Sequence, residues 1–393
     1  MSRTSATARV PTLSVDLYSE ETLLNPIETY RRIREAGAAV WLPKHRLWVV
    51  GRYADVRQAL SDGDTYRSGN GVATNPLTNV LMSGTTLASD GDAHVKRRRL
   101  LWQSLSSKAL STVAPVLHGE ASALTVKLCQ RDEFDGVSEF AAHLPIRVVA
   151  DLVGVAIDHD RMRKYGRAGF DVLGPPNRRT VRGMPAGLSF WHYARSLRPG
   201  DVKPGGWAES ILAAGRDGTL SPAEAKAMVL DFIGPSLDTT ILASAQLLWS
   251  LGTNPDVWGE LRNNPDLVPA AAVEAVRLGS PVRGFARMVK QDTEIDGVVL
   301  RSGQRVVLLY ASANMDETQF EQPEVFSLRR KGANLGWGFG AHACVGMHLA
   351  KMEMHALMCA MIPEVAHIGV ANPVRLLNNT LQGFASLRAT FRR

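Results

Sequence analysis

A glycine-rich loop surrounds the most reactive side chain of this sequence. In "GWGFGAHACVGMHLAKMEM", residues 336–354, several glycines crowd around Cys344, and a stretch of good helix formers follows at once. Glycine lets a backbone approach another group closely, and a thiolate near a helix N-terminus is stabilised by free N–H groups and by the helix dipole. A single cysteine in such a turn is more often just a buried residue, so the spacing of the surrounding motif has to decide.

A second group of reactive side chains lies in a long stretch with a helical period. Residues 231–242, "DFIGPSLDTTIL", place Pro235 in the middle of that stretch and follow it with Asp238 and Thr239. A proline in a helix interior removes a backbone donor and costs about 3 kcal/mol. An acid beside a hydroxyl can relay a proton, whereas in many helices the threonine hydroxyl only bonds back to a carbonyl one turn earlier.

The composition indicates an ordinary globular protein. The chain has 393 residues, 45% of them hydrophobic and 21% charged. Its three cysteines are too few and too scattered for a disulfide framework or a zinc cluster, which favours a reducing compartment. We expect residues 1–14 to be a disordered leader, because they lack a signal-peptide core, and no run of roughly 18 uncharged apolar residues predicts a membrane span. The sequence thus predicts a cytoplasmic protein.

Hydrophobic periodicity predicts the elements that hold these residues. Residues 94–280 are mostly helical in period, and a capping box of Ser221 and Glu224 begins the helix that contains Pro235. Short β-branched or aromatic runs predict strands at 38–50, 287–314 and 373–391, and residues 61–93 read as a long irregular connection. We therefore expect one mainly α domain, residues 15–393, with small β-sheets near the N-terminus, in the middle and near the C-terminus.

The loop around Cys344 resembles the haem-ligand loop of the cytochrome P450 superfamily, Phe-Gly-x-Gly-x-His-x-Cys-x-Gly-x-x-Leu-Ala. The matching residues are Gly338, Gly340, His342, Cys344, Gly346, Leu349 and Ala350. Trp337 stands where the family usually has phenylalanine. The resemblance implies the P450 fold, haem b (iron protoporphyrin IX) as cofactor and Cys344 as the iron ligand.

Other segments match the family in the same order. Glu274 and Arg277, in "EAVR", resemble its structural Glu-x-x-Arg pair, with Arg329 as their implied partner in the meander before the cysteine loop. His94 and Arg98, in "AHVKRRR", resemble its propionate-binding His-x-x-x-Arg, and Arg287 falls where bacterial members have a further propionate arginine. The resemblance implies that these side chains bind the haem together with His342.

The resemblance also implies a reaction. A thiolate ligand favours cleavage of the O–O bond, and the family delivers protons with an acid and an alcohol in its central helix. Those roles fall on Asp238 and Thr239, whose presence favours an oxygen-using monooxygenase over a peroxygenase. Pro235 and Ser236 replace the usual small residues, and we expect the helix to be opened there, with the proline ring over the iron.

The partners follow from charge. No segment resembles a flavin or iron–sulfur module, so electrons must come from another protein. Basic residues before and around the haem motifs, namely Lys96, Arg97, Arg99, Arg330 and Lys331, suit an acidic ferredoxin with its reductase, although a solvated basic face would look the same. The basic runs are short and lack interleaved aromatics, so nucleic acid is not an expected partner. We expect a monomer that binds a small-molecule substrate.

The C-terminal half resembles the P450 group that demethylates para-alkoxybenzoates. That resemblance implies a compact pocket walled by Phe170, Leu173, Val282 and Phe285, next to Pro235. The arginine and the serines that hold the benzoate are missing, and Asp231 and Gly234 stand at the serine positions. We therefore expect hydroxylation or O-dealkylation of a compact hydrophobic molecule that is neutral or weakly basic, with an aromatic ring as one option. A tailoring oxidase for a larger natural product, or a haem protein without turnover, remains an alternative.

Overall fold

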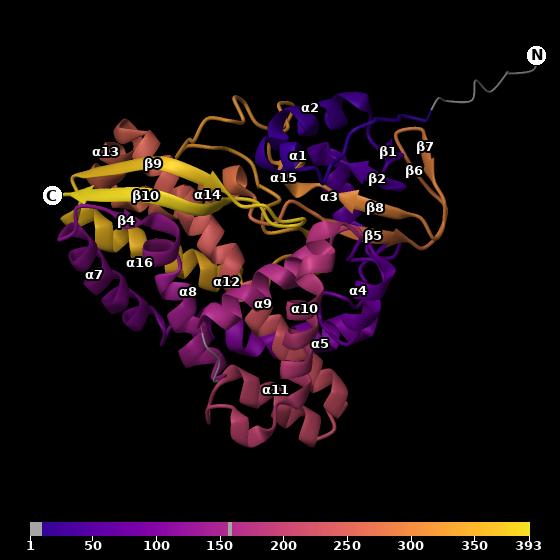
Figure 1. Cartoon of the computed structure of the whole chain (residues 1–393), viewed down its shortest axis with the longest axis horizontal. Helices are drawn as coiled ribbons and strands as arrows, with labels where there is room; N and C mark the ends of the chain where they lie inside the picture. Colours follow the sequence, from indigo (N-terminus) through magenta and orange to yellow (C-terminus); the bar gives the residue numbers. More distant parts are fainter. Residues whose placement is uncertain (1–9, 156–158) are drawn as a thin grey trace, which may run out of the picture.

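Helices make up most of the chain that the computed structural model describes, residues 10–155 and 159–393 (Figure 1). The α-helices are α1 (Glu20–Leu24), α2 (Pro26–Ala36), α3 (Tyr53–Ser61), α4 (Pro76–Leu81), α5 (Gly91–Leu105), α6 (Ser107–Leu110), α7 (Ala114–Cys129), α8 (His143–Val148), α9 (His159–Asp171), α10 (Arg178–Ser196), α11 (Trp207–Arg216), α12 (Pro222–Thr253), α13 (Pro255–Asn263), α14 (Val268–Gly279), α15 (Tyr310–Ala313) and α16 (Met347–Glu364). Short 3-10 or π segments are η1 (Gly136–Ala141), η2 (Val149–Val153), η3 (Pro199–Asp201), η4 (Pro265–Leu267) and η5 (Gly340–His342). The predicted mainly α class is confirmed.

The strands form small sheets at the edges of the helical body. They are β1 (Val40–Leu42), β2 (Leu47–Val50), β3 (Tyr66–Arg67), β4 (Phe134–Asp135), β5 (Phe285–Val289), β6 (Thr293–Ile295), β7 (Val298–Leu300), β8 (Arg305–Leu308), β9 (His367–Arg375) and β10 (Phe384–Arg392). One sheet has the order β1-β2-β8-β5-β3, a second the order β4-β10-β9, and β6 pairs with β7. The first sheet thus joins the strands predicted near the N-terminus to those predicted in the middle of the chain.

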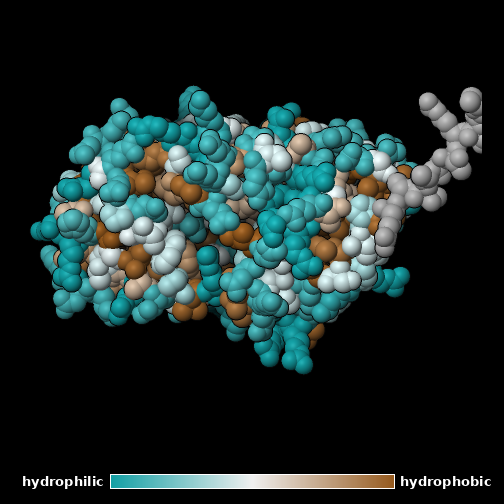
Figure 2. All heavy atoms as spheres, turned by 90° about the horizontal axis from the view of Figure 1, so that it is seen from above, coloured by the Kyte–Doolittle hydropathy of each residue, from teal (hydrophilic) through white to brown (hydrophobic). Residues whose placement is uncertain are grey.

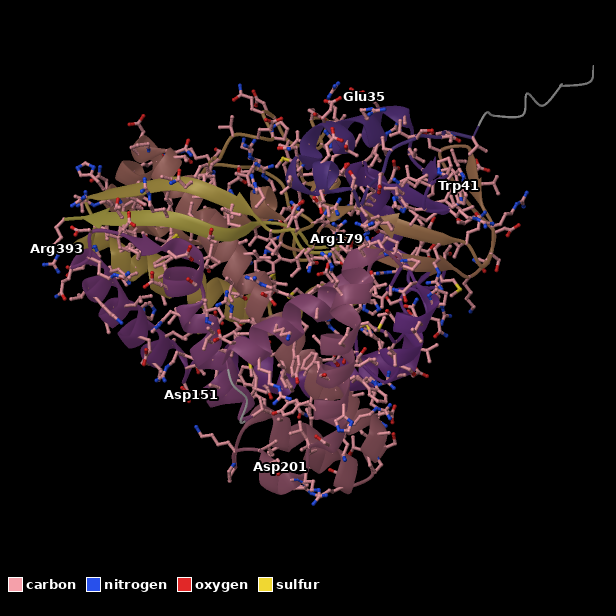
Figure 3. All side chains as sticks on the ribbon, viewed as in Figure 1. Glu35, Trp41, Asp151, Arg179, Asp201 and Arg393 are labelled. Atoms are coloured by element: carbon pink, nitrogen blue, oxygen red, sulfur yellow. The ribbon has the colours of Figure 1, made fainter. Side chains whose placement is uncertain are left out.

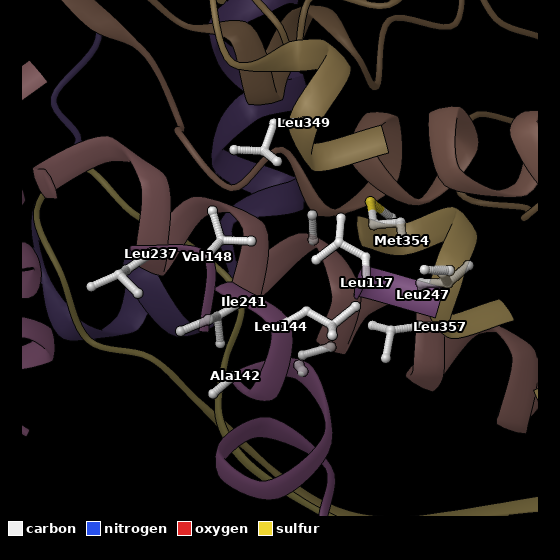
Figure 4. Close-up of a cluster of buried hydrophobic side chains, with 14 of the residues drawn as sticks. Leu117, Ala142, Leu144, Val148, Leu237, Ile241, Leu247, Leu349, Met354 and Leu357 are labelled. Atoms are coloured by element: carbon white, nitrogen blue, oxygen red, sulfur yellow. The ribbon is translucent and has the colours of Figure 1, made fainter. Parts of the chain in front are cut away.

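The central helix α12 and the helix after the cysteine loop, α16, share one hydrophobic core. Figure 4 shows Leu237 and Ile241 of α12 in the same cluster as Leu349, Met354 and Leu357 of α16. All five side chains are buried. The core therefore holds the two helices that carry the candidate chemistry in a fixed relation.

The capping predicted for α12 is confirmed. The Ser221 hydroxyl accepts a bond from the Glu224 amide at 3.3 Å, and the Glu224 carboxylate accepts one from the Ser221 amide at 3.0 Å. This capping box satisfies backbone donors that the first turn leaves unpaired. The start of α12 is thus set by local sequence.

The predicted opening of this helix around residues 234–236 is wrong, because α12 continues through Pro235 without a break. Pro235 cannot donate to the carbonyl of Asp231, and nearby hydroxyls bond back to other carbonyls: Thr239 Oγ1 donates to the Pro235 carbonyl at 2.6 Å, and the Ser236 hydroxyl also bonds one turn back. Buried side chains lie directly before and after the proline, among them Phe232, Ile233 and Leu237. Their packing keeps the helix continuous despite one missing bond.

The hairpin of α9 and α10 is bound to both ends of the chain. Arg179, labelled in Figure 3 at the start of α10, donates to Asn379 Oδ1 at 3.1 Å and also bonds the carbonyl of Tyr18. The amide of Asn379 in turn donates to the Asp171 carboxylate at 2.8 Å. These bonds fix the loop between α9 and α10 against the N-terminal segment and the loop between β9 and β10.

Part of the predicted leader is ordered. Residues 1–9 lie outside the described residues, but Pro11 accepts a backbone bond from Trp41 at 2.8 Å, and Leu13 donates one to the Trp41 carbonyl at 3.0 Å. A leader extending to residue 14 is therefore too long, because this segment adds itself to the edge strand β1.

The surface carries no extended apolar belt in the view of Figure 2, where apolar groups are small and separated by hydrophilic side chains. Within the two described ranges, no helix is both long enough and apolar enough to cross a bilayer.

Candidate active site

The loop before α16 holds Cys344 through backbone contacts. The Cys344 amide donates to the carbonyl of Trp337 at 2.7 Å, which closes the loop on itself. Gly338 and Gly340 adopt φ angles of 68° and 67°, a region that favours glycine. A Cβ on Gly340 would lie 2.4 Å from the carbonyl oxygen of Leu60, so only glycine allows α3 to approach this closely.

Burial and the start of α16 act on the pKa of the Cys344 thiol in opposite directions. The cysteine keeps an accessible surface, but the protein that surrounds it removes enough water to raise the pKa of the thiol. The backbone amides of Gly346 and Met347, at the start of α16, and the guanidinium of Arg98 act in the opposite direction. Donors at a helix N-terminus stabilise a thiolate, so the loop can hold the deprotonated ligand that a metal requires.

Four basic side chains converge beside this loop. The rings of His94 in α5 and His342 in η5 lie 4.1 Å apart, and Arg287 of β5 is only 3% exposed. Burial, followed by the charges of Arg287, His94 and Arg98, lowers the pKa of His342 to about 3. The predicted propionate-binding residues are thus brought together from three separate parts of the chain.

This cluster fits the two carboxylates of a haem. His94 Nε2 is buried and has no hydrogen-bond partner among the described residues. In the same residues, neither Arg98 nor Arg287 forms an ion pair with a carboxylate, and the Arg287 guanidinium contacts the neighbouring Ala286 carbonyl at 2.8 Å and the Tyr310 hydroxyl. Buried cations need anionic partners, and a dianionic cofactor supplies them. The thiol and the basic cluster are therefore a donor set suited to haem.

Asp238 of α12 faces α9. Its side chain is 1% exposed, and Oδ1 lies 3.4 Å from Arg167 Nε, whereas Oδ2 has no partner among the described residues. A Cβ on Gly166 would lie 2.4 Å from Asp238 Oδ2, so the glycine makes room for the carboxylate. Thr239, the next residue, is half-buried.

Burial sets the acidity of Asp238. It raises the pKa of the carboxyl group to about 6, and the charges of Arg167 and Arg163 act against that rise. A carboxyl group with such a pKa gains and loses protons readily near neutral pH. The acidity of Asp238 therefore suits proton transfer.

Asp231 lies two turns before Asp238 on the same helix and has a different partner. Its Oδ2 accepts a hydrogen bond from the backbone amide of Thr86 at 2.8 Å. Burial raises the pKa of Asp231 to about 6 as well, and the Thr86 amide opposes the rise. The carboxylate that we expected in the substrate pocket is therefore bonded to the loop between α4 and α5.

The predicted pocket walls form one apolar cluster. Phe170, Leu173, Val282 and Phe285 lie in it, together with Val72, Ala73, Leu242, Leu376 and Leu381. Pro235 is not a member of this cluster and is exposed, in contrast to the buried residues around it on α12. The structure thus gathers the four predicted wall residues and leaves Pro235 outside their cluster.

The buried pair Glu274–Arg277 is present, but its predicted third partner is wrong. Arg277 Nε lies 2.8 Å from Glu274 Oε2, and Arg330, not Arg329, contacts Glu274 Oε1 at 3.1 Å. Arg329 is exposed and pairs with Glu260. Residues 329 and 330 lie in a turn that directs neighbouring side chains to opposite sides, so the position of one is no guide to the other.

The basic surface near the cysteine loop is smaller than predicted. Arg97 is buried and pairs with Glu224 at 2.6 Å, and Arg330 is held by Glu274. Lys96, Arg99 and Lys331 are exposed. Three of the five predicted cations are therefore accessible to a protein partner.

Sequence reasoning missed the residues of α9 that face Asp238. Arg163 and Arg167 are one turn apart, in "RMRKYGR", which is the signal that could have identified a basic face on this helix. Gly166 lies between them and gave no signal, because its role depends on how closely α9 approaches α12.

A cysteine thiol at a helix N-terminus, basic groups that suit haem propionates, and an acid on a long central helix define a haem-thiolate oxygenase. The comparisons with known proteins agree. The cytochrome P450 family model matches residues 206–365. Cytochrome p450 CYP199A2 of Rhodopseudomonas palustris is 30% identical over 388 residues, which cover 97% of this chain and 94% of the relative. The chain belongs to the cytochrome P450 family.

Further relatives agree with this assignment. Linalool 8-monooxygenase of Pseudomonas putida is 26% identical, over 95% of this chain and 96% of the relative. A crystal structure of P450BioI in complex with an acyl carrier protein that carries hexadec-9Z-enoic acid superimposes with a TM-score of 0.85 at 22% identity, over 95% of this chain and all of that one, which shows the shared fold. The protein is a P450 monooxygenase, with haem b as the cofactor of its family.

Proposed function

We propose that this enzyme uses O2 and two electrons from a ferredoxin to hydroxylate or O-dealkylate a compact hydrophobic small molecule. The observation that carries the proposal is the combination of Cys344 at the start of α16 with the buried acid of Asp238 on α12. The first suits an iron ligand and the second suits proton delivery. Both are held by the same helical core.

The haem-binding roles fall on five side chains. Cys344 would bind the iron as a thiolate, which favours cleavage of the O–O bond when haem is present. His94, Arg98, Arg287 and His342 would bind the propionates, since this dianion satisfies the unpartnered nitrogen of His94 and the buried charge of Arg287. Glu274, Arg277 and Arg330 would stabilise the segment before the cysteine loop and take no part in the reaction.

Proton delivery falls on Asp238 and Thr239. Asp238 Oδ2 is free to accept or release a proton, while Arg167 holds Oδ1. The Thr239 hydroxyl donates to the Pro235 carbonyl, so its oxygen keeps lone pairs to accept a bond from water or a bound ligand. Asp238 would supply the proton, and the Thr239 hydroxyl would hydrogen-bond the water that carries it. The apolar pocket wall would exclude other water.

The electron donor would be an acidic ferredoxin, served by its own reductase. Lys96, Arg99 and Lys331 are exposed around the segments that lead to the haem site. Charge pairs of this kind speed encounter and weaken with salt. Raising ionic strength should slow reduction of the enzyme by a ferredoxin, and a rate independent of salt would refute this partner.

The substrate would be compact, hydrophobic and neutral or weakly basic. The four predicted wall residues belong to one apolar cluster, which suits a hydrophobic molecule. Because Asp231 is bonded to Thr86, its charge is a weaker argument against a benzoate than the lack of any Lys or Arg between Arg67 and Lys96. Titration with small aromatics, terpenes and amines should give spin shifts, and tight spin-shifting binding of 4-methoxybenzoate would overturn this assignment.

The ligand assignment has a direct spectroscopic test. The reduced enzyme should give a carbon-monoxide difference band at the position typical of thiolate-ligated haem, and Cys344→Ala should lose it. Retention of that band in the variant would refute Cys344 as the ligand.

We further propose that the chain from residue 10 onward acts as a single catalytic domain, in the cytoplasm and as a monomer. Three free cysteines, Cys129, Cys344 and Cys359, suit a reducing compartment. Size-exclusion chromatography of the holoenzyme tests the oligomeric state.

A further inference from the structure

The loop between α4 and α5 lies directly against the first half of α12. A Cβ on Gly84 would lie 3.1 Å from the Cβ of Ala227, so the two backbones approach closely. One turn further along α12, Asp231 accepts the bond from the Thr86 amide. We call residues 82–89 the 82–89 segment. It packs against α12 at Gly84 and is hydrogen-bonded to it at Thr86.

A side chain of α5 also bonds the 82–89 segment. Arg97, itself paired with Glu224 at 2.6 Å, reaches the Thr85 carbonyl at 3.4 Å. The bond from Thr86 to Asp231 is shorter, and a carboxylate makes it charge-assisted, which is roughly twice as strong as a neutral hydrogen bond. Asp231 is therefore the strongest polar contact between this segment and the central helix.

The residues that follow Thr86 pack against the proposed pocket wall. Leu87 and Ala88 pack against the apolar cluster that contains Phe170 and Phe285. The position of these two side chains depends on the backbone at Thr86, because they are its immediate neighbours. The same carboxylate that binds the amide thus determines where this part of the pocket wall lies.

We propose that Asp231 is a positioning residue for substrate selection: its carboxylate fixes the 82–89 segment and thereby keeps the pocket compact. The inference rests on the proposed function, because it assigns the wall of that same pocket. Asp231 does not touch substrate. It acts through Thr86 on Leu87 and Ala88.

The physical argument predicts how variants differ. Asparagine keeps an oxygen that can accept from the Thr86 amide, so Asp231→Asn preserves the contact. Alanine removes the acceptor and leaves a buried N–H unpaired, so Asp231→Ala releases the segment. Serine is too short to reach the amide, and Asp231→Ser provides a second disruptive variant if the alanine variant does not fold.

Nitrogen ligands that bind haem iron directly measure pocket width without turnover or a known substrate. For the holoenzyme we expect 4-phenylimidazole to bind tightly and the bulky clotrimazole weakly, from the Soret shift in each titration. We define the ligand ratio as the dissociation constant of clotrimazole divided by that of 4-phenylimidazole. In Asp231→Ala or Asp231→Ser this ratio should fall at least tenfold, because a wider pocket admits the bulky ligand. Asp231→Asn should stay within about threefold of the wild-type ratio.

Hydrogen exchange tests the contact itself. The Thr86 amide should exchange at least tenfold faster in Asp231→Ala than in the wild type, and Asp238→Asn, which alters a buried acid on the same helix, should leave this exchange unchanged. An unchanged ligand ratio and unchanged exchange in both disruptive variants would overturn the proposal. A wild-type protein that gives no Soret shift with either ligand would instead refute the haem site.

Discussion

Asp231 and Asp238 lie on the same face of α12, and burial raises the pKa of each to about 6. Their partners differ. Asp231 accepts a bond from a backbone amide, whereas Asp238 lies near the guanidinium of Arg167 and keeps one oxygen without a partner among the described residues. The Thr86 amide occupies one oxygen of Asp231, whereas Asp238 Oδ2 can still gain or lose a proton. Acidity alone therefore does not separate a positioning acid from a catalytic one, but hydrogen bonding does.

The largest expected effect is on product formation in Asp238→Asn. The amide fits the same space and can still bond Arg167, but it cannot carry a proton, and a positioned acid contributes about 100-fold or more to rate. We expect product per electron pair to fall about 100-fold while oxygen is still consumed. Product analysis alongside NADH consumption measures this coupling.

The matched control is Asp231→Asn, which makes the same chemical change two turns away. It should lower coupling by no more than about threefold. If both variants lose coupling equally, the difference in hydrogen bonding between Asp231 and Asp238 does not affect catalysis.

Both acids should make the protein less stable as pH rises. The usual pKa of an aspartate is 3.8, and each folded value is about 6, so the native state binds more protons than the unfolded state between these values. The contribution of these two acids to the free energy of unfolding is then greatest below pH 3.8 and is lost as pH rises through 6. The difference corresponds to about 3 kcal/mol per acid at neutral pH.

Asparagine removes this pH dependence. Relative to the wild type, Asp238→Asn should gain stability between pH 4 and pH 7, by up to about 3 kcal/mol less the lost attraction to Arg167. Denaturant midpoints of the holoenzyme across this range give the measurement. A constant difference between variant and wild type at every pH would show that Asp238 titrates normally.

Removing the counter-charge should shift the pH profile. Arg167 lowers the pKa of Asp238, so Arg167→Gln raises it further and delays proton release. Arg167 is partly exposed, so solvent reduces the effect. We expect coupled turnover at pH 7 to fall about tenfold and to recover about one pH unit higher. Lys164→Gln, at an exposed neighbour on α9, should leave the profile in place.

The parts of the site that the sequence predicts are those with a local pattern. The spacing of Cys344 and His342 follows from one loop, and the capping of α12 follows from Ser221 and its neighbours. The residues that face Asp238 come from a helix about 70 positions earlier. Whether they meet depends on how α9 and α12 pack, which no local spacing encodes.

Two errors have the same physical origin. Arg329 and Arg330 are adjacent in a turn, and the backbone angles of that turn decide which one reaches Glu274. The partner of Asp231 is a backbone amide in an irregular loop, and every residue except proline offers such a donor. Side-chain identity therefore could not reveal either contact.

Pro235 lies between the two acids, and its replacement tests whether they act independently. Pro235→Ala restores an N–H that can donate to the Asp231 carbonyl and tightens the helix at that turn. Because α12 is already continuous and the proline side chain is exposed, we expect changes of only about twofold to threefold in the substrate-induced spin shift and in coupling. If the variant loses both the hydrogen bond from the Thr86 amide to Asp231 and the coupling of electrons to product, the conformation of this turn links Asp231 to Asp238. If both quantities stay at their wild-type values, the proline serves packing alone, and the two acids can be interpreted as separate sites on one rigid helix.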